Sequence, residues 1–484
     1  MWCKRLLTSR GAWVGLTVAG LGLALVVQSF LVRGSGSAAV IAHLALAVPI
    51  LAVGVVTALV AGRSGYAPGK VMLGFCAIVV AGALANLLPS LVLPGRGGWS
   101  AILPLIHPTG IDFRLGLYNP AAAFSSAHSS WPPLTLVLGW PFTLVSASSG
   151  YIVQVAILIV LAVAATILSA KLATKVATRP ALVGQERSIA VRPIAVVIGL
   201  WLLTSYGLLF AVERGNVDLY ALFFSLMAVW LMLRQSKSVW LPAVFLALAI
   251  NLKLYPAVLL VLIFWRYRWR AVLPVVVTNL VLLLIAGPGN AWHFLVNVHS
   301  MQGHPYYWVG NHSAASYAHA LRSIYSGLPS WLGSALLLVP LALFAFTIVV
   351  LVRRGWSDRG AVFAAAACVP LMSFVPAVSH DYKLVLLVFP LAVLAVAVAT
   401  MERVSAVLWS VLFLVLGLTT IFLARSTLLP LPFDKLPLFI RLQNKYPLLL
   451  LAQVLLLAVV LLSGRDMAAL EVGGKVVSGG AGDE

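Results

Sequence analysis

The amino-acid sequence predicts an all-α membrane protein that crosses the bilayer about 12–14 times. Hydrophobic residues make up 62% of the 484 residues and charged residues only 9%, whereas a soluble globular domain is about 25% charged. The mean hydropathy is +1.06. Apolar runs of about 17–25 residues, the length that crosses a bilayer as a helix, recur along the whole chain. A soluble enzyme, a disordered chain and a collagen-like chain are therefore excluded.

The apolar runs give the predicted membrane spans in order. The first run follows three basic residues, and its roughly 21 apolar residues exceed a signal-peptide core, so we expect an uncleaved anchor. The pair 236–252 and 254–265 is also compatible with one long helix, and the run 132–148 with a full span or a short re-entrant piece. The predicted spans are 12–33, 39–61, 71–93, 150–171, 193–212, 217–233, 236–252, 254–265, 271–286, 331–352, 360–378, 384–400, 404–424 and 447–463.

The basic residues assign the sides of the membrane. With the N-terminus inside, about two thirds of the 32 Lys and Arg residues fall in cytoplasmic loops, as the positive-inside rule predicts. The net charge of +20 therefore reflects these loops and not a nucleic-acid partner. Three polar stretches then lie outside, 94–131, 287–330 and 378–384, and we expect interfacial helices within them. This pattern predicts a multi-pass protein of the plasma membrane that works on the extracytoplasmic face.

Asp112 is the first candidate for chemistry, in the segment Pro108–Arg114 of the first outer loop. The chain has only twelve Asp and Glu residues, so acid–base chemistry draws on a short list. A carboxylate at the interface that faces a lumen can accept a proton from an alcohol. The alternative is a loop aspartate in an N-cap or Asx-turn.

The charged turn Glu213–Asp218 separates two apolar runs and contains Arg214 and Asn216. One interpretation is a capped turn with a local ion pair. The other is the outer boundary of a site.

Lys253 lies within about 27 mostly apolar residues and is followed by Pro256, which indicates a helix break. An ionisable residue inside a membrane is costly and is a functional hypothesis by default. The expected partner is a lipid phosphate, and the alternative is an amine that snorkels from a helix end.

The short loop Ser379–Lys383 brings an imidazole, a carboxylate, a phenol and an amine into five residues. Such a set could hold a phosphate or a sugar, and the alternative is a polar turn between helices. Five of the nine histidines lie between 293 and 319, but their spacings match no metal motif. We therefore expect an aromatic loop at the interface there, and no metal. Its expected anchors are Trp292, Tyr306, Tyr307 and Trp308.

Several signatures are absent from the sequence. There is no Walker A loop, no Gly-x-Gly-x-x-Gly fingerprint and no Gly-x-Ser-x-Gly nucleophile elbow. The three cysteines form no metal or redox spacing. No cofactor is expected, and any group donor must already be membrane-bound on the outer side.

Four short elements, taken in order, resemble the bacterial polyprenyl-phosphate-mannose-dependent mannosyltransferases, which are of GT-C type. They span roughly 108–385 of the chain. The family's Gln is missing from the second element, and three helices precede the Asp loop where about one is expected. The elements are Asp112 followed by Trp131-Pro-Pro-Leu, Arg214-Gly-Asn in place of Gly-Gln-x-Asn, Lys253-Leu-Tyr-Pro for Lys-x-x-Pro, and Ser379-His-Asp-Tyr for the Pro-x-x-Trp-x-His-Tyr region.

The resemblance implies a GT-C-like catalytic domain over 71–465. It would be preceded by a two-helix segment at 1–70 and followed by a flexible cytoplasmic tail at 466–484. The implied reaction inverts the sugar while moving it, mannose by family, from a polyprenyl phosphate to a hydroxyl of a lipid-linked or glycan acceptor. Apolar grooves for the lipid tails are expected among the membrane helices.

The resemblance also implies a role for each candidate residue. Asp112 is expected to be the catalytic base. The donor phosphate is expected to bind Lys253, His380, Lys383 and Arg214. The substrates are expected to contact Asn216, Trp131, Tyr382 and Asp381.

Two other functions remain compatible with the residues. A lipid or solute transporter or flippase would also use many helices, a broken helix and a lysine inside the membrane, although transporters bind substrate at the midplane. A ligase or acyltransferase of the outer leaflet could use His380.

Overall fold

The computed structural model describes part of the chain. Of the predicted segments, 1–70 is described only in short pieces, 71–93 and 404–484 lie outside the described residues, and most of the outer loop 94–131 does too. The described residues are 15–16, 19–20, 23, 48, 51–56, 59, 110, 112–119, 131–176, 191–234, 238–303, 311–324 and 327–400.

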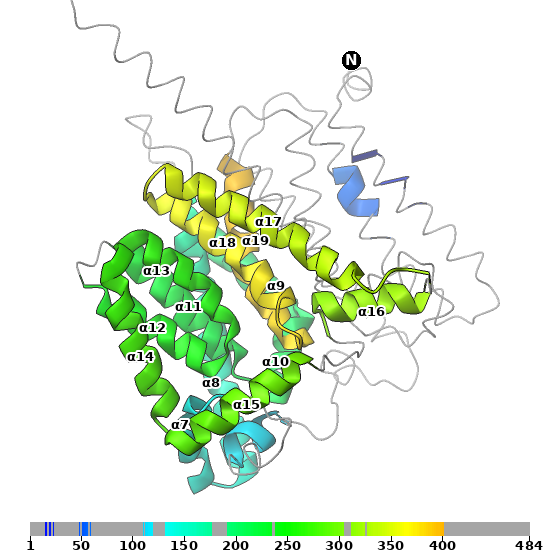
Figure 1. Ribbon diagram of the computed structural model, residues 1–484. Helices are drawn as coiled ribbons and strands as arrows, with labels where there is room; N and C mark the ends of the chain where they lie inside the picture. The colour runs from blue at the N-terminus through cyan, green and yellow to red at the C-terminus, as the bar shows by residue number, and fades with distance from the viewer. Residues whose placement is uncertain are drawn as a thin grey trace, which may run out of the picture.

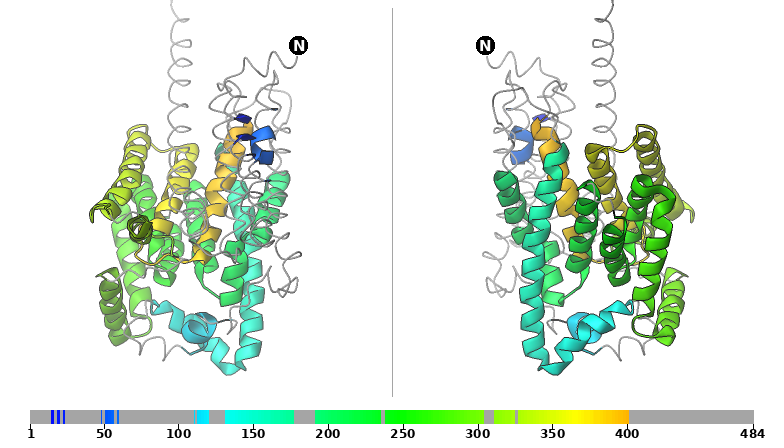
Figure 2. Two further views of the ribbon diagram at one scale, coloured as in Figure 1. Left: turned by 90° about the vertical axis from the view of Figure 1, so that its right-hand side faces the viewer. Right: turned by 90° about the vertical axis from the view of Figure 1, so that its left-hand side faces the viewer.

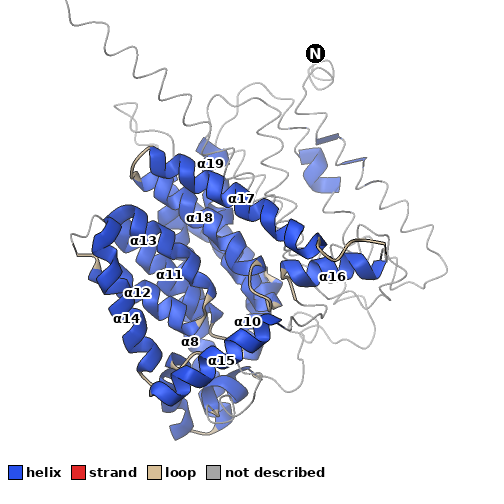
Figure 3. Ribbon diagram, in the orientation of Figure 1, coloured by secondary structure: helices blue, strands red, loops and turns tan. Residues whose placement is uncertain are grey.

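Every regular element in these residues is helical (Figure 3), which confirms the predicted all-α class. The α-helices are α7 (Leu134–Gly139), α8 (Ala147–Ala173), α9 (Val191–Thr204), α10 (Tyr206–Arg214), α11 (Asp218–Leu233), α12 (Trp240–Leu252), α13 (Leu260–Tyr267), α14 (Val272–Leu284), α15 (Pro288–Gly303), α16 (Ala314–Ile324), α17 (Leu332–Arg353), α18 (Asp358–Phe374) and α19 (Val388–Thr400). Short 3₁₀-helices, and one short π-helix (η2), complete the list: η2 (Phe113–Tyr118), η3 (Trp140–Leu144), η4 (Thr174–Val176), η5 (Tyr255–Leu259), η6 (Arg268–Ala271) and η7 (Asp381–Leu387).

Three stretches are long and apolar enough to cross a membrane: Ala147–Val176, Tyr255–Leu284 and Leu332–Arg353. Shorter apolar helices accompany them, at Leu134–Leu144, Asp218–Leu233, Trp240–Leu252 and Tyr382–Ala397. The chain is therefore a polytopic membrane protein, as its composition predicts.

The described residues also decide between the alternatives that the sequence left open. The run 132–148 holds two short helices, α7 and η3, and no full span. The backbone is extended at Lys253 (φ −151°, ψ 131°), so α12 ends there and a separate helical turn, η5, follows. In the predicted span 193–212, Ser205 ends α9 and caps α10 by accepting a hydrogen bond from the Leu208 N–H.

Helix α8 runs along the bundle from one end to the other (Figure 2). It carries large exposed apolar side chains such as Ile152 and Val160, and a helix that is apolar all round is typical of a membrane span. Near its start lies Gln154, which is buried. Just beyond its end, Lys175 pairs with Asp358 at the start of α18, at 3.4 Å.

The core of the bundle contains α18, whose residues Ala364–Ala367 are fully buried. Small side chains let neighbouring helices approach closely, which is the usual packing solution in membranes. Helix α17 packs along α18, and α11, α12 and α14 form a neighbouring row (Figure 1).

The short elements η2, α7 and η3 lie across one end of the bundle, the end at which α8 begins (Figure 2). The predicted outer stretch 287–330 contains two helices, α15 and α16. Of its expected aromatic anchors, Trp292 is exposed, and Tyr306, Tyr307 and Trp308 lie outside the described residues.

Candidate active site

The turn between α10 and α11 is the centre of the candidate site. Helix α10 ends at Gly215, which has a φ of +67°, and an added Cβ there would lie 2.6 Å from the Cβ of Phe113. Glycine is therefore required both by the left-handed backbone and by the close approach of the Asp112 segment. Asn216 then forms an Asx-turn just before α11, because its Oδ1 accepts a hydrogen bond from the Asp218 N–H at 3.1 Å.

Asp112 is held by two side chains of this turn. Arg214 donates from Nε to Asp112 Oδ2 at 2.8 Å and from Nη2 to Oδ1, and Asn216 donates from Nδ2 to Oδ2 at 2.7 Å. The Asp112 and Arg214 side chains are 12% and 20% exposed. A carboxylate offers about four lone-pair positions. Donors from the described residues occupy three of them, so among these residues Oδ1 keeps one position for a further donor.

The segment after Asp112 anchors the carboxylate to the bundle. Phe113 and Leu117 are buried, and Phe113 packs edge-on against Phe142, with ring centroids 5.2 Å apart. The Gly110 N–H donates to the Glu213 carbonyl at 2.7 Å, so the chain on both sides of Asp112 is fixed to the turn or the bundle.

Helix α8 holds the turn through two side chains. The Tyr151 hydroxyl donates to the Glu213 carbonyl at 2.8 Å, and Gln154 Nε2 donates to the Gly215 carbonyl at 3.1 Å. The Tyr220 hydroxyl in turn donates to Gln154 Oε1 at 2.9 Å. Buried polar groups are thus paired, and the pairing fixes the end of α10 against α8.

Lys253 lies beside the turn in a second cluster. Its Nζ is 3.5 Å from Asp218 Oδ2, 4.9 Å from the ring centroid of Trp131 and 5.4 Å from that of Tyr382. The Tyr255 hydroxyl donates to Asp218 Oδ1 at 2.6 Å. The Lys253 ammonium is therefore enclosed by one carboxylate and two aromatic faces, which attract a cation.

The loop after α18 adds His380 and the start of η7. The ring of His380 lies 5.2 Å from that of Tyr382, which stacks on Phe210 at 6.2 Å. Lys383 is buried, and its Nζ donates to the Val378 carbonyl at 2.9 Å and lies 4.8 Å from the Tyr255 ring.

The electrostatics around His380 follow from this crowding. Burial lowers the pKa of the His380 imidazole to about 3. The charge of Asp112 acts in the opposite direction, and three cations lower this pKa further, namely Arg214, Lys383 and Lys253. His380 is therefore a neutral imidazole at physiological pH.

A segment of the predicted outer stretch 287–330, beginning at Asn311, is hydrogen-bonded to this loop. Asn311 is fully buried, donates from Nδ2 to the Ala377 carbonyl at 2.9 Å and accepts the Ser379 N–H at 2.9 Å. The His312 N–H donates to the Ser379 carbonyl at 2.7 Å. The position of His380 thus depends on a segment about seventy residues away in sequence.

The structure brings eight of the nine candidate residues into one region, in two carboxylate–cation clusters and the loop that carries His380. The backbone of Asp381 begins η7, but its side chain is outside the described part of the chain. Within the described residues, no three His, Cys, Asp or Glu side chains group as a metal site would require.

Sequence reasoning missed three residues of this region. Asp218 received no role beyond its place in the charged turn, and Tyr255 appeared only within the Lys253-Leu-Tyr-Pro element. Asn311 had a local signal, because an Asn whose Oδ1 accepts the N–H two residues on forms an Asx-turn, here with Ser313.

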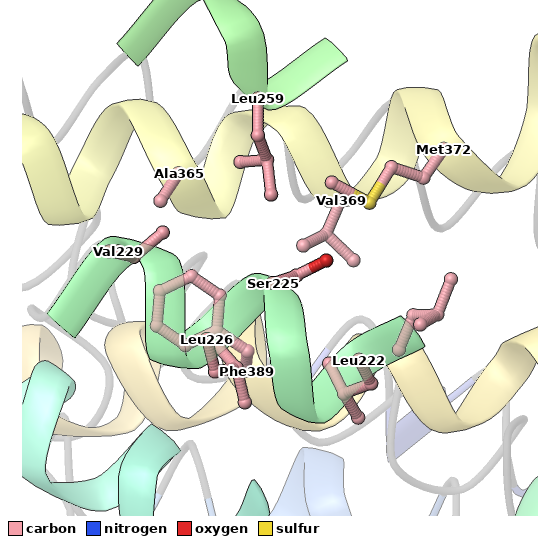
Figure 4. A pocket seen from close by; sticks show the side chains of 10 residues that line it. Leu222, Ser225, Leu226, Val229, Leu259, Ala365, Val369, Met372 and Phe389 are labelled. Atoms are coloured by element: carbon pink, nitrogen blue, oxygen red, sulfur yellow. The ribbon is translucent and has the colours of Figure 1, made fainter. Parts of the chain in front are cut away.

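A small apolar pocket lies between α11 and α18 inside the bundle (Figure 4). Its volume is only about 10 Å³, room for about one water molecule, and its lining comes from α11, η5, α18, η7 and α19. Ser225 is the polar residue of the lining, and its buried Oγ has no hydrogen-bond partner among the described residues.

Comparison with known proteins gives one family. No curated protein matches the chain. The profile of glycosyltransferase family 87 matches residues 130–379, which is more than half of the chain. The matched range includes Trp131, the turn after α10 and Lys253, and it ends next to His380. The chain therefore belongs to glycosyltransferase family 87, a family of integral membrane enzymes of the GT-C type.

Proposed function

We propose that this membrane glycosyltransferase moves a hexose, with mannose as the first candidate, from a polyprenyl-phosphate sugar to a hydroxyl of a cell-envelope glycolipid or glycan. The reaction takes place on the extracytoplasmic face of the plasma membrane, where the polar stretches are predicted to lie. A phosphate-linked donor agrees with the Lys253 ammonium, which is partly exposed beside Asp218.

The observation that carries the proposal is the geometry of Asp112. Arg214 and Asn216 fix its carboxylate, the described residues leave one lone pair of Oδ1 unused, and the side chain is partly exposed. Such a carboxylate is oriented to accept one proton from a substrate. Arg214 acts mainly on Asp112, because two of its nitrogens already donate there.

The reaction is a single displacement. The acceptor hydroxyl gives its proton to Asp112, and its oxygen attacks the anomeric carbon of the donor. The bond between that carbon and the phosphate oxygen breaks at the same time, and the electron pair leaves with the phosphate. The configuration at the sugar inverts, and no covalent enzyme intermediate forms.

The departing phosphate needs cations or N–H donors where its charge develops. Lys253 is the best placed cation, because its side chain is 18% exposed and lies beside Trp131 and Tyr382. His380 serves as a neutral N–H donor. Lys383 is buried and bound to its own loop, so its charge acts on the phosphate over a longer range.

The sugar and the acceptor contact the remaining candidates. Trp131 and Tyr382 offer aromatic faces for a pyranose, and Asn216 and Asp381 complete the proposed substrate contacts.

The test is transfer of radiolabelled sugar from polyprenyl-phosphate mannose into cell-envelope lipids by the reconstituted full-length protein. We expect Asp112→Asn to fold normally and to lose a factor of about 10²–10⁴ in rate, the usual contribution of a general base. The matched control is Asp358→Asn, which removes a carboxylate paired with Lys175 far from the site and is expected to keep the rate.

The outcomes separate the parts of the proposal. Near-normal turnover of the Asp112 variant would contradict the assignment of Asp112 as the catalytic base. A wild-type protein that uses another polyprenyl-phosphate sugar would correct the sugar. Movement of an intact lipid or solute without a glycosylated product would favour the transporter, and transfer of an acyl group the acyltransferase. Membership of a glycosyltransferase family and polar clusters at one end of the bundle favour transfer of a sugar.

A further inference from the structure

Asp218 is a buried carboxylate that the proposed reaction leaves without a role. It is the first residue of α11 and is fully buried. An ionised carboxylate away from water is costly unless it is paired and hydrogen-bonded, so its partners indicate what it does.

Its two oxygens have different surroundings. Oδ1 accepts the Tyr255 hydroxyl at 2.6 Å. Oδ2 accepts no hydrogen bond from the described residues and faces the Lys253 ammonium at 3.5 Å, slightly beyond a good charge-assisted hydrogen bond. The main attraction left to Oδ2 is therefore the charge of Lys253.

Lys253 is accessible where Asp218 is not. An ammonium has three N–H donors, and one directed at Asp218 leaves others for an incoming anion. The extended backbone at Lys253 ends α12, and the side chain reaches the space between Trp131 and Tyr382. Without a fixed carboxylate behind it, this long side chain has many rotamers, and its ammonium loses a defined position.

One amide connects this pair to the proton acceptor. Asn216 Nδ2 donates to Asp112 Oδ2, and Asn216 Oδ1 accepts the Asp218 N–H. The same turn therefore fixes the group that takes the acceptor proton and the carboxylate that faces the lysine.

We propose that Asp218, oriented by Tyr255, is the positioning residue for Lys253 and holds its ammonium where charge develops on the departing phosphate. This inference rests on the proposed function and deepens it. Asp218 touches no substrate and acts only through Lys253.

The first test is the kinetics of Asp218→Asn with the polyprenyl-phosphate sugar donor. The change keeps the shape and an acceptor for Tyr255 but removes the charge. We expect kcat to fall about 100-fold, the cost of misplacing a reacting group by about 1 Å. The KM for the donor should fall, because Lys253 loses its competing anion. A raised KM with an unchanged kcat contradicts the proposal.

A double-mutant cycle separates positioning from a merely structural role. In the background Lys253→Met, Asp218→Asn should cause no further loss, because the ammonium that it positions is gone. Losses that multiply in the double variant overturn the inference. If Asp218→Asn does not fold, Tyr255→Phe enters the same cycle, because it removes the hydrogen bond that orients the carboxylate.

Binding of polyprenyl phosphate alone keeps this inference distinct from the proposed function. It is measured on the wild type, Asp218→Asn, Lys253→Met and the double variant. If the wild type transfers no mannose, the sugar assignment fails, but the cycle can still be read from these affinities. Asp218→Asn should change the affinity when Lys253 is present and leave it unchanged in Lys253→Met. An equal change in both backgrounds rejects the positioning role.

Discussion

At the scale of single residues, His380 acts differently from what its chemistry alone indicates. The sequence predicted it among the residues that bind the donor phosphate, where a protonated imidazole would be the natural partner. Burial, together with three neighbouring cations, lowers its pKa to about 3 and keeps it neutral. Its proposed contribution to phosphate binding is therefore that of an N–H donor without a charge.

A pH profile tests this. An imidazole with a pKa of about 3 is deprotonated above that pH, so it does not titrate between pH 5 and pH 8 in the free enzyme. We expect His380→Gln, which keeps an N–H donor, to lower kcat/KM while the shape of its pH dependence from 5 to 8 stays unchanged. The measurement is kcat/KM against pH for both proteins, since this ratio reports the free enzyme. An acid limb that disappears in the variant contradicts a neutral His380.

Sequence reasoning identified most of these residues because polar side chains are conspicuous in an apolar chain. It could not identify their partners. Asp112 pairs with Arg214, which lies 102 positions further along the chain. Asp218, at the start of α11, pairs with Lys253, just after the end of α12. Hydropathy is a local property, whereas such pairs depend on how the helices pack.

At the scale of elements, the turn from α10 to α11 concentrates the constraints of the site. Two conditions apply at Gly215: a left-handed backbone, and a neighbouring side chain, Phe113, with which an added Cβ would clash. Gly355, after α17, shares the first condition with a φ of +83° but has open space around it.

Alanine substitutions at these two glycines separate the conditions. Gly215→Ala should destabilise the protein by more than the roughly 1–3 kcal/mol of an unfavourable backbone region, because its Cβ meets Phe113 at 2.6 Å. Gly355→Ala should cost only the backbone part and leave transfer intact. Thermal unfolding in detergent and the transfer assay measure both effects. Equal destabilisation would mean that Phe113 moves aside without cost.

The elements were more predictable than the contacts. Apolar runs predicted α8, α11, α14 and α17 closely, because a membrane span needs a continuous apolar length. The break at Ser205 was missed, because a single capping residue inside an apolar run leaves the hydropathy unchanged. The break at Lys253 was found, because a charge and a proline mark it.

At the scale of the whole molecule, the polar clusters and the Lys175–Asp358 pair lie at opposite ends of α8. Gln154, which supports the turn, is about 21 residues before Lys175, or roughly 32 Å at the rise of an α-helix. The hydrocarbon core of a bilayer is about 30 Å thick. The distance between the two ends therefore matches the thickness of the hydrocarbon core. This match predicts that the candidate site lies near one membrane surface.

This length makes the enzyme sensitive to the thickness of the membrane around it. In thinner or thicker bilayers, hydrophobic mismatch costs fractions of a kcal/mol per Å and is relieved by tilting α8 or deforming the lipid. Because Tyr151 and Gln154 hold the turn that carries Arg214 and Asn216, we expect a tilt of α8 to disturb the Asp112 carboxylate. Reconstitution in phosphatidylcholines of stepwise longer chains should give a transfer rate that peaks near 30 Å of hydrocarbon. A transfer rate that does not change with hydrocarbon thickness would mean that the site does not respond to the tilt of α8.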